Sequence, residues 1–343
     1  MYMNKRVTAV LFALLAALFY ALNAPVSKTL LNDIGPRMLA GLLYLGAGIG
    51  IGLMSLSKKK KEEKLTKDDL PYVLGMIILD IAAPIFLMTG LNMANAANVS
   101  LLNNFEIVAT TLIALLIFKE RVSLRLWIGV ILITVASILL SLEEGSGLSI
   151  DLSLGALLVL LACVCWGFEN NCTRKISSKD TYEIVFIKGI FSGSGSFIIA
   201  LLSGESIPEL KYVLCALLLG FVAYGLSIFF YIKAQSEIGA AKTSAYYAVA
   251  PFMGTFISYV FLKEKLTVYY LPALVIMLIG SLIVVIDTLL IHHSHMHTHT
   301  ITHTHDGSTH THVITHSHQH NHLLDDEHHT HTHPGLNPHE KRA

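Results

Sequence analysis

Charged residues are scarce in this sequence. Only 14% of the 343 residues are Asp, Glu, Lys or Arg, whereas 53% are hydrophobic. About one quarter of the residues in a soluble domain are charged, so this balance excludes an ordinary soluble protein and favours a polytopic membrane protein. The formal net charge of +0 identifies no partner by itself. We expect the lipid bilayer as one partner and expect no nucleic acid.

Other features are missing as well. The four cysteines lie in apolar stretches, which predicts packing residues rather than a disulfide framework. We find no nucleophile elbow, phosphate-binding loop or His-Glu-x-x-His helix, and therefore predict no catalytic residue, no enzyme activity and no cofactor for transport. Without a nucleotide-binding motif, any transport is expected to use a proton or sodium gradient, or exchange. Histidine is absent from residues 1–291, although the chain has 18.

Long apolar segments fill the first 291 residues. A spanning helix needs about 20 mainly apolar residues, and backbone polar groups in lipid must be paired within the protein. The sequence therefore predicts an all-α integral membrane protein with ten transmembrane helices. The predicted helices cover residues 7–27, 37–56, 71–91, 98–118, 123–142, 153–173, 183–203, 211–233, 242–262 and 268–291.

The distribution of lysine and arginine predicts the orientation in the cell membrane. With the N-terminus inside, the inner segments hold 18 of these residues and the outer segments hold five, while Lys188 falls within a helix. Positive charge is enriched on the cytoplasmic side. We therefore expect both termini to be cytoplasmic.

The chain also repeats itself at a constant spacing. The stretch NVSLLNNFEIVATTLIALLIFKERVS at 98–123 resembles KTSAYYAVAPFMGTFISYVFLKEKLT at 242–267, so that Glu120 matches Glu264. An odd number of helices per copy inserts the second copy upside down, which is typical of transporters. The predicted domains are a first five-helix repeat (1–145), a second (146–291) and a histidine-rich tail (292–343).

Both copies carry an apolar helix that ends in Lys-Glu-Arg or Lys-Glu-Lys before a short polar turn. Phe105-Glu106-Ile107 and Ala250-Pro251 each keep part of a Leu-Glu-Pro element, and Trp166-Gly167 matches a Trp-Gly element. Together these features resemble the EamA family of the drug/metabolite transporter superfamily, over about residues 7–287. The resemblance implies transport of a small organic solute, often outward. It does not identify the cargo, and the tail lies outside the family pattern.

Polar side chains within the predicted helices are the candidate substrate or coupling-ion site. A charge near the bilayer centre costs about 2.5–3.5 kcal/mol, so such a residue usually faces a cavity or a partner. Glu106 is the strongest candidate, because Asn103 and Thr110 share its helix face at i−3 and i+4. The alternative is a structural hydrogen bond between helices.

Four further polar residues join this candidate site: Asp80, Asn23, Glu169 and Lys188. Pro25 is expected to kink the first helix near Asn23. Glu169 could instead reach the membrane surface. We expect Lys188 to bind an anionic solute or to pair with a carboxylate such as Glu106.

The tail alternates histidine with threonine. Imidazole binds zinc, nickel and copper, so we expect the tail to bind divalent metal, with zinc, nickel or cobalt as candidates. The predicted ligands are His297, His299, His303, His305, His310, His312, His316, His318, His320 and His322.

The tail is also a mirror about its centre. His305 faces His310 and His297 faces His318 if residues 306–309 form a four-residue loop. Alternate residues of a strand share a face, so this register predicts a hairpin over 297–318 with histidine pairs on one side. A disordered low-complexity strip is the alternative.

Three functions fit these patterns. The first is a secondary transporter, an exporter, of a small organic solute, with a metal-binding tail that regulates it. The second is a transporter of Ni²⁺, Co²⁺ or Zn²⁺, or of a metal complex, whose tail collects the cargo. The third is a membrane metal sensor, for which a repeat would be unnecessary. The oligomeric state is not predicted.

Overall fold

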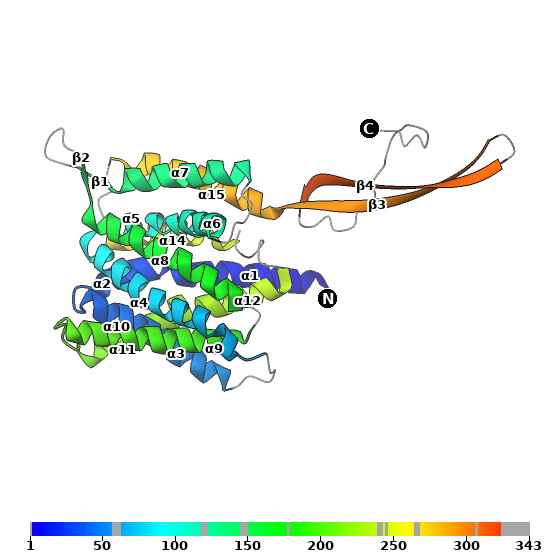
Figure 1. Cartoon of the computed structure of the whole chain (residues 1–343). Helices are drawn as coiled ribbons and strands as arrows, with labels where there is room; N and C mark the ends of the chain where they lie inside the picture. The colour runs from blue at the N-terminus through cyan, green and yellow to red at the C-terminus, as the bar shows by residue number, and fades with distance from the viewer. Residues whose placement is uncertain are drawn as a thin grey trace. The chain divides into compact units, whose positions relative to one another are not determined.

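A computed structural model describes residues 2–56, 63–117, 123–144, 150–176, 179–238, 243, 246–263, 268–305 and 308–323. The chain divides into two compact units, Met1–Val285 and Ile286–Ala343. The first unit is a bundle of helices whose long axes run in similar directions, and the second contains a two-stranded ribbon (Figure 1).

Apolar helices build the first unit. In chain order they are α1 (Tyr2–Ala21), α2 (Asn23–Leu30), α3 (Pro36–Ser55), α4 (Leu70–Met93), α5 (Ala96–Leu102), α6 (Phe105–Leu116), α7 (Leu124–Leu140), α8 (Leu154–Ile176), α9 (Thr181–Ile187), α10 (Gly193–Leu202), α11 (Leu210–Gly220), α12 (Ser227–Ile238), α14 (Ala250–Leu262) and α15 (Tyr270–Leu289).

Seven helical segments in the described ranges are long and apolar enough to cross a membrane. They are Val7–Leu30, Pro36–Ser55, Lys67–Met93, Leu154–Thr173, Thr181–Leu202, Leu210–Ala234 and Tyr270–Asp287, and two shorter apolar helices are Leu124–Leu140 and Ala250–Leu262. Many large hydrophobic side chains are exposed on the bundle, as expected for a surface that faces lipid. The chain is therefore a multi-pass membrane protein.

Two predicted continuous helices are in fact interrupted. The predicted helix 98–118 is divided at Asn103 and Asn104, where α5 ends and α6 begins. Asparagine side chains compete with helical backbone hydrogen bonds, which explains a break at this pair. The first helix is divided at Leu22, three residues before Pro25, whose ring nitrogen cannot donate to the helix.

Two other helices contain a wider turn. Lys188–Ser192 (η2) and Phe221–Leu226 (η3) are π-helical, and they join α9 to α10 and α11 to α12. Such π-segments insert one extra residue per turn and are frequent at functional sites. Lys188 begins the first of them, and Tyr224 lies in the second.

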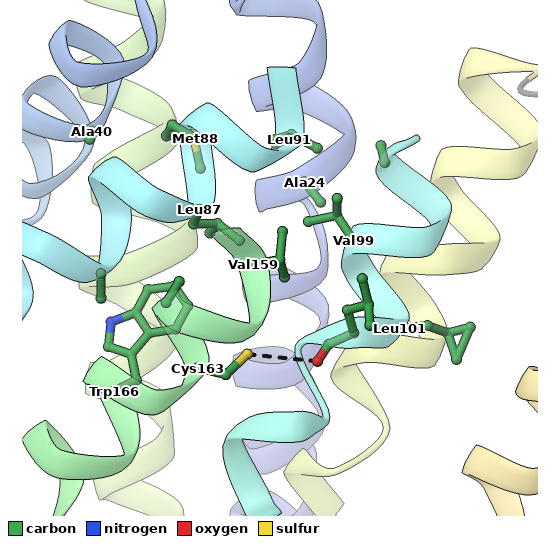
Figure 2. Packing of buried hydrophobic residues seen from close by; sticks show 14 of the residues in the cluster. Ala24, Ala40, Leu87, Met88, Leu91, Val99, Leu101, Val159, Cys163 and Trp166 are labelled. Carbon is green, nitrogen blue, oxygen red and sulfur yellow. Dashed lines mark hydrogen bonds between the residues drawn. The ribbon is translucent and has the colours of Figure 1, made fainter. Parts of the chain in front are cut away.

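Small residues allow close helix crossings. A Cβ atom added at Gly90 would lie 2.6 Å from the carbonyl oxygen of Gly155, so α4 and α8 touch through their backbones. Gly48 and Gly189 make an equivalent contact between α3 and η2. Figure 2 shows the apolar packing beside the first crossing, where Leu87 and Leu91 lie near Val159. Close approach through glycine is a common means of packing helices in membranes.

A short hairpin connects the two predicted repeats. Strand β1 (Leu142–Glu144) pairs antiparallel with β2 (Ile150–Leu152), largely in the segment between the predicted helices 123–142 and 153–173, for which no strand was predicted. The predicted domain boundary at 145/146 lies outside the described residues.

The second unit pairs β3 (Leu290–His305) with β4 (Ser308–Leu323) in antiparallel fashion. The strands are longer than the predicted 297–318, and the register differs from the predicted mirror. His303 lies opposite His310, and His297 lies opposite His316. The shift has a physical reason, since Asp306-Gly307 suits a two-residue connection better than a four-residue loop. The observed register differs from the predicted one by two residues. Successive residues of a strand alternate between its two faces, so a shift of two leaves each residue on its predicted face.

The glycine contact predicts a stability effect. We expect Gly189→Ala to lower the free energy of unfolding by about 1–3 kcal/mol, because the new methyl group would overlap the backbone of Gly48. Gly75→Ala is the matched control, since its Cβ would meet only the Cys172 Sγ atom at 3.2 Å. Thermal unfolding of both variants in detergent measures the difference. Equal unfolding temperatures would contradict the tight crossing.

Candidate functional site

A buried ion-pair cluster joins three helices. The Lys188 Nζ atom lies 3.0 Å from Asp80 Oδ2 and 3.0 Å from Glu169 Oε1. The side chains of Asp80 and Glu169 are 0% and 2% exposed, and that of Lys188 is 15% exposed. One ammonium group is thus shared by two carboxylates inside an apolar bundle. Because α4 belongs to the first predicted repeat, and α8 and η2 belong to the second, the cluster links the two repeats.

The local sequence explains the positions of these charges. Asp80 lies one turn before Pro84, whose missing N–H leaves the carbonyl group of residue 80 without its helical partner. Hydroxyl groups of Ser192 and Ser196 donate to the neighbouring α4 carbonyls of residues 77 and 81, at 3.2 and 3.4 Å. The serines of the second repeat therefore anchor η2 and α10 against α4 beside the ion pair.

Tyr44 and Trp166 hold the first carboxylate in place. The Tyr44 hydroxyl donates to Asp80 Oδ1 at 2.9 Å, and the Trp166 indole N–H donates to the Tyr44 oxygen at 3.4 Å. Thr173 donates to Glu169 from the following turn of α8. Each carboxylate of the cluster thus accepts a hydroxyl donor in addition to the ammonium group. Such hydrogen bonds are needed if a buried ion pair is to offset the loss of its hydration.

Glu106 lies in a second polar group next to the first. Asn170 Nδ2 donates to Glu106 Oε1 at 2.6 Å and to Thr110 Oγ1 at 3.4 Å. The predicted pairing of Glu106 with Thr110 on one helix face is therefore supported by a shared donor from α8. Asn103 lies on the other side of the helix break, with its Oδ1 atom buried and unpaired among the described residues. Lys188 pairs with carboxylates, one of the two predicted roles, but its partners are Asp80 and Glu169 and not Glu106, the example considered.

Asn23 contributes to a different contact. Its Nδ2 atom donates to the Tyr224 hydroxyl at 3.0 Å, and Ser27 donates to its Oδ1 atom at 3.1 Å. Tyr224 in turn packs against Tyr44, with ring centroids 5.2 Å apart. Asn23 is thus connected to the ion-pair cluster through two tyrosine rings.

Sequence reasoning missed the aromatic part of the site. Five tyrosines form a continuous chain of ring contacts, in the order Tyr44, Tyr224, Tyr20, Tyr247 and Tyr231. Tyrosines in an apolar helix resemble ordinary packing residues in sequence. The sequence feature that could have indicated them is the tyrosine hydroxyl group, since a buried hydroxyl usually requires a polar partner.

Metal sites were sought among the side chains that the structure places. No group of three or more His, Cys, Asp or Glu side chains in these described ranges could hold a metal ion. The predicted tail ligands lie on β3 and β4, for which the structure provides backbone positions and register.

Comparison with known proteins agrees with the fold and the repeat. The model of the EamA-like transporter family matches the chain twice, over residues 7–142 and 153–286. A membrane bundle with two matched copies defines the class as membrane transporter. The chain belongs to the EamA-like transporter family, which confirms the predicted resemblance.

Similar proteins include transporters from an archaeon and a bacterium. One, described as an uncharacterized transporter of Methanothermobacter thermautotrophicus, is 26% identical over 81% of this chain and 86% of its own length. The uncharacterized transporter YvbV of Bacillus subtilis is 27% identical, covering 79% and 89% of the two chains. A solved structure described as "Crystal structure of protein" has a TM-score of 0.61 and 16% identity, over 82% of this chain and 98% of its own, which shows the shared fold.

The ion-pair cluster predicts a selective loss of stability. Lys188→Met leaves Asp80 and Glu169 without their cation, so we expect a loss of about 3–5 kcal/mol in the free energy of unfolding. Glu169→Gln is the matched control, because it preserves one Lys188–Asp80 pair and should cost less. Unfolding of the purified proteins in detergent measures both. A Lys188→Met protein as stable as the unmodified one would contradict the shared ion pair.

Proposed function

We propose that the chain is a secondary transporter that moves a small organic solute out of the cell. The ion-pair cluster carries this proposal, because Asp80 comes from one repeat while Glu169 and Lys188 come from the other. A charged group shared by two repeats is sensitive to their relative movement. Binding of a solute or coupling ion between them would therefore bias that movement, which is the basis of alternating access.

We propose ten membrane crossings arranged as two inverted five-helix repeats. Helix pairings within the bundle support this arrangement, since they occur in matched sets. The first helix packs against the eighth (α1 with α12), as the sixth packs against the third (α8 with α4). The fourth helix packs on the sixth (α6 with α8), as the ninth packs on the first (α14 with α1). An inverted repeat produces such exchanged pairs.

We propose further that both termini are cytoplasmic. The support is the lysine and arginine distribution, with 18 such residues in the inner segments and five in the outer ones. The histidine-rich tail would then lie in the cytoplasm, where a rise in divalent metal concentration could regulate transport.

Metal binding by the tail is also a proposal. Its histidines alternate along β3 and β4, so that four cross-strand positions pair two histidines: His293 with His320, His295 with His318, His297 with His316, and His303 with His310. The five-ångström scale of cross-strand neighbours suits two imidazole groups that share a metal ion. Zinc, nickel and cobalt are the proposed metals.

A transporter of the metal itself is the competing function. Metal binding by the tail is compatible with both functions, whereas the ion-pair cluster already gives its carboxylates a lysine partner. We therefore favour the organic solute.

A cell experiment separates the two functions. We expect cells that express the Glu106→Gln variant and cells that express the unmodified protein to tolerate Ni²⁺, Co²⁺ and Zn²⁺ equally, because this residue acts on the organic solute. A protein that ends at residue 291 tests the tail, and Glu209→Gln, an exposed carboxylate beside Lys211, is the control. Metal tolerance that the full protein alters and Glu106→Gln restores would contradict the proposal and make metal the cargo.

The tail hairpin has its own test. A lone two-stranded hairpin is marginal in water, so we expect Zn²⁺ or Ni²⁺ to increase the strand content of a peptide that covers 290–323. Circular dichroism with and without metal measures this change. A control peptide with serine at every histidine position should not respond. An unchanged coil spectrum in metal would contradict the metal-ordered hairpin.

A further inference from the structure

Carboxyl groups outnumber ammonium groups among the described residues of the ion-pair cluster and the adjacent Glu106 group. Lys188 is shared by Asp80 and Glu169, while the structure gives Glu106 a single hydrogen-bond donor, Asn170, and no described lysine or arginine partner. Three carboxyl groups thus accompany one ammonium group. An unpaired charge inside a membrane protein is costly. A mobile cation or a proton at Glu106 would remove this cost.

Buried hydrogen-bond acceptors near Glu106 also lack donors among the described residues. The Oδ1 atoms of Asn103 and Asn104 are buried and have no partner among the described residues. Both side chains are at least nine-tenths buried. Both residues lie at the break between α5 and α6, and the amide groups of Glu106 and Ile107 donate to their carbonyl oxygens. Unpaired buried acceptors cost free energy until a donor or a cation reaches them.

The end of α5 adds a third acceptor that could face a cation, a backbone carbonyl group. At the end of α5, the Cys163 thiol is the described donor to the Leu102 carbonyl, at 3.7 Å (Figure 2). A thiol is a weak donor, so the Leu102 carbonyl keeps most of its capacity to accept. Interrupted helices in transporters place such backbone carbonyl groups beside a bound cation.

The neighbouring tyrosines indicate which kind of cation fits. Tyr20 and Tyr224 of the tyrosine chain belong to the same packed hydrophobic cluster as Phe105 and Ile107, which flank Glu106 in α6. Aromatic faces attract organic cations and also cover their hydrocarbon portions. A bare alkali ion would need several oxygen ligands at short range and would gain little from aromatic rings. The surroundings of Glu106 therefore suit an organic ammonium group.

We propose that the solute carried by this transporter bears a protonated amine, which binds at the α5–α6 break with Glu106 as its counter-charge. The N–H groups of the ammonium donate to Glu106 and to the Asn103 Oδ1 atom, which has no partner among the described residues. The hydrocarbon part of the solute contacts the tyrosine chain. This inference rests on the proposed transport function, and it names the substrate class of that same site.

Trp166 provides a direct reporter of binding. Its indole donates to Tyr44, which packs against Tyr224 in the tyrosine chain. The second tryptophan, Trp127, lies in α7 and is 37% exposed. Trp127→Phe in the full-length protein therefore leaves a single tryptophan next to the proposed site.

Binding is measured by titrating this protein in potassium buffer with phenethylammonium. We expect a saturable change in Trp166 emission, and we expect 2-phenylethanol, which has the same ring without the charge, to cause none. Glu106→Gln should weaken the amine by at least about tenfold, since it removes the counter-charge. Glu209→Gln, on the surface, should leave the affinity unchanged. Tyr20→Phe should retain binding, whereas Tyr20→Leu should weaken it.

Three results would overturn the inference. The first is an equal response to phenethylammonium and 2-phenylethanol, and the second is an unchanged affinity in a folded Glu106→Gln protein. The third is a response to Na⁺ that depends on Glu106 and that the amine does not displace, because the site would then hold an alkali ion.

Uptake by proteoliposomes separates this inference from the proposed function. The inference predicts counterflow of radiolabelled phenethylammonium that Glu106→Gln abolishes. If neutral or anionic solutes exchange and the amine does not, the transport function stands and the amine inference fails. If the amine binds next to Trp166 without being transported, the site stands and the transport function fails.

Discussion

A single ammonium group shared by two carboxylates is the interaction on which the bundle depends. Lys188 lies between Asp80 and Glu169, all three side chains being largely removed from solvent. Neither carboxylate is tolerable alone in an apolar bundle, and the lysine is equally costly without them. The three helices that carry these residues must therefore pack together, and two of them come from a different repeat than the third.

Several irregularities of the helices follow from this requirement. The π-helical turn begins at Lys188, and Pro84 interrupts the hydrogen bonding of α4 one turn after Asp80. Close crossings through glycine bring the backbones near enough for short side chains to meet. Hydroxyl groups add hydrogen bonds beside these irregular turns, from Ser192 to the Ile77 carbonyl oxygen and from Tyr44 to the Asp80 carboxylate. Under the proposed function, this cluster is where a charged solute or ion would exchange with internal partners.

Sequence patterns predicted the membrane class and the family, because hydropathy and repeat spacing are local properties. Each predicted helix range overlaps a described helix, and the break at Leu22 lies beside the kink expected from Pro25, whereas the break at Asn103 was not predicted. A carboxylate partner for Lys188 was predicted, but Asp80 and Glu169 were not identified as the partners, since helix periodicity gives the face of a residue and not the helix opposite it. The tyrosine chain depends on five residues spread over the fold. No single-helix pattern could reveal it.

The most direct measurement is a cryo-electron microscopy structure of the protein in a lipid nanodisc, at a resolution that shows side chains. The account predicts that the Lys188 side chain lies between Asp80 and Glu169, within ion-pair distance of both, in at least one conformation of the transporter. A Lys188 side chain that extends to the membrane surface in every conformation, with the two carboxylates apart, would contradict it.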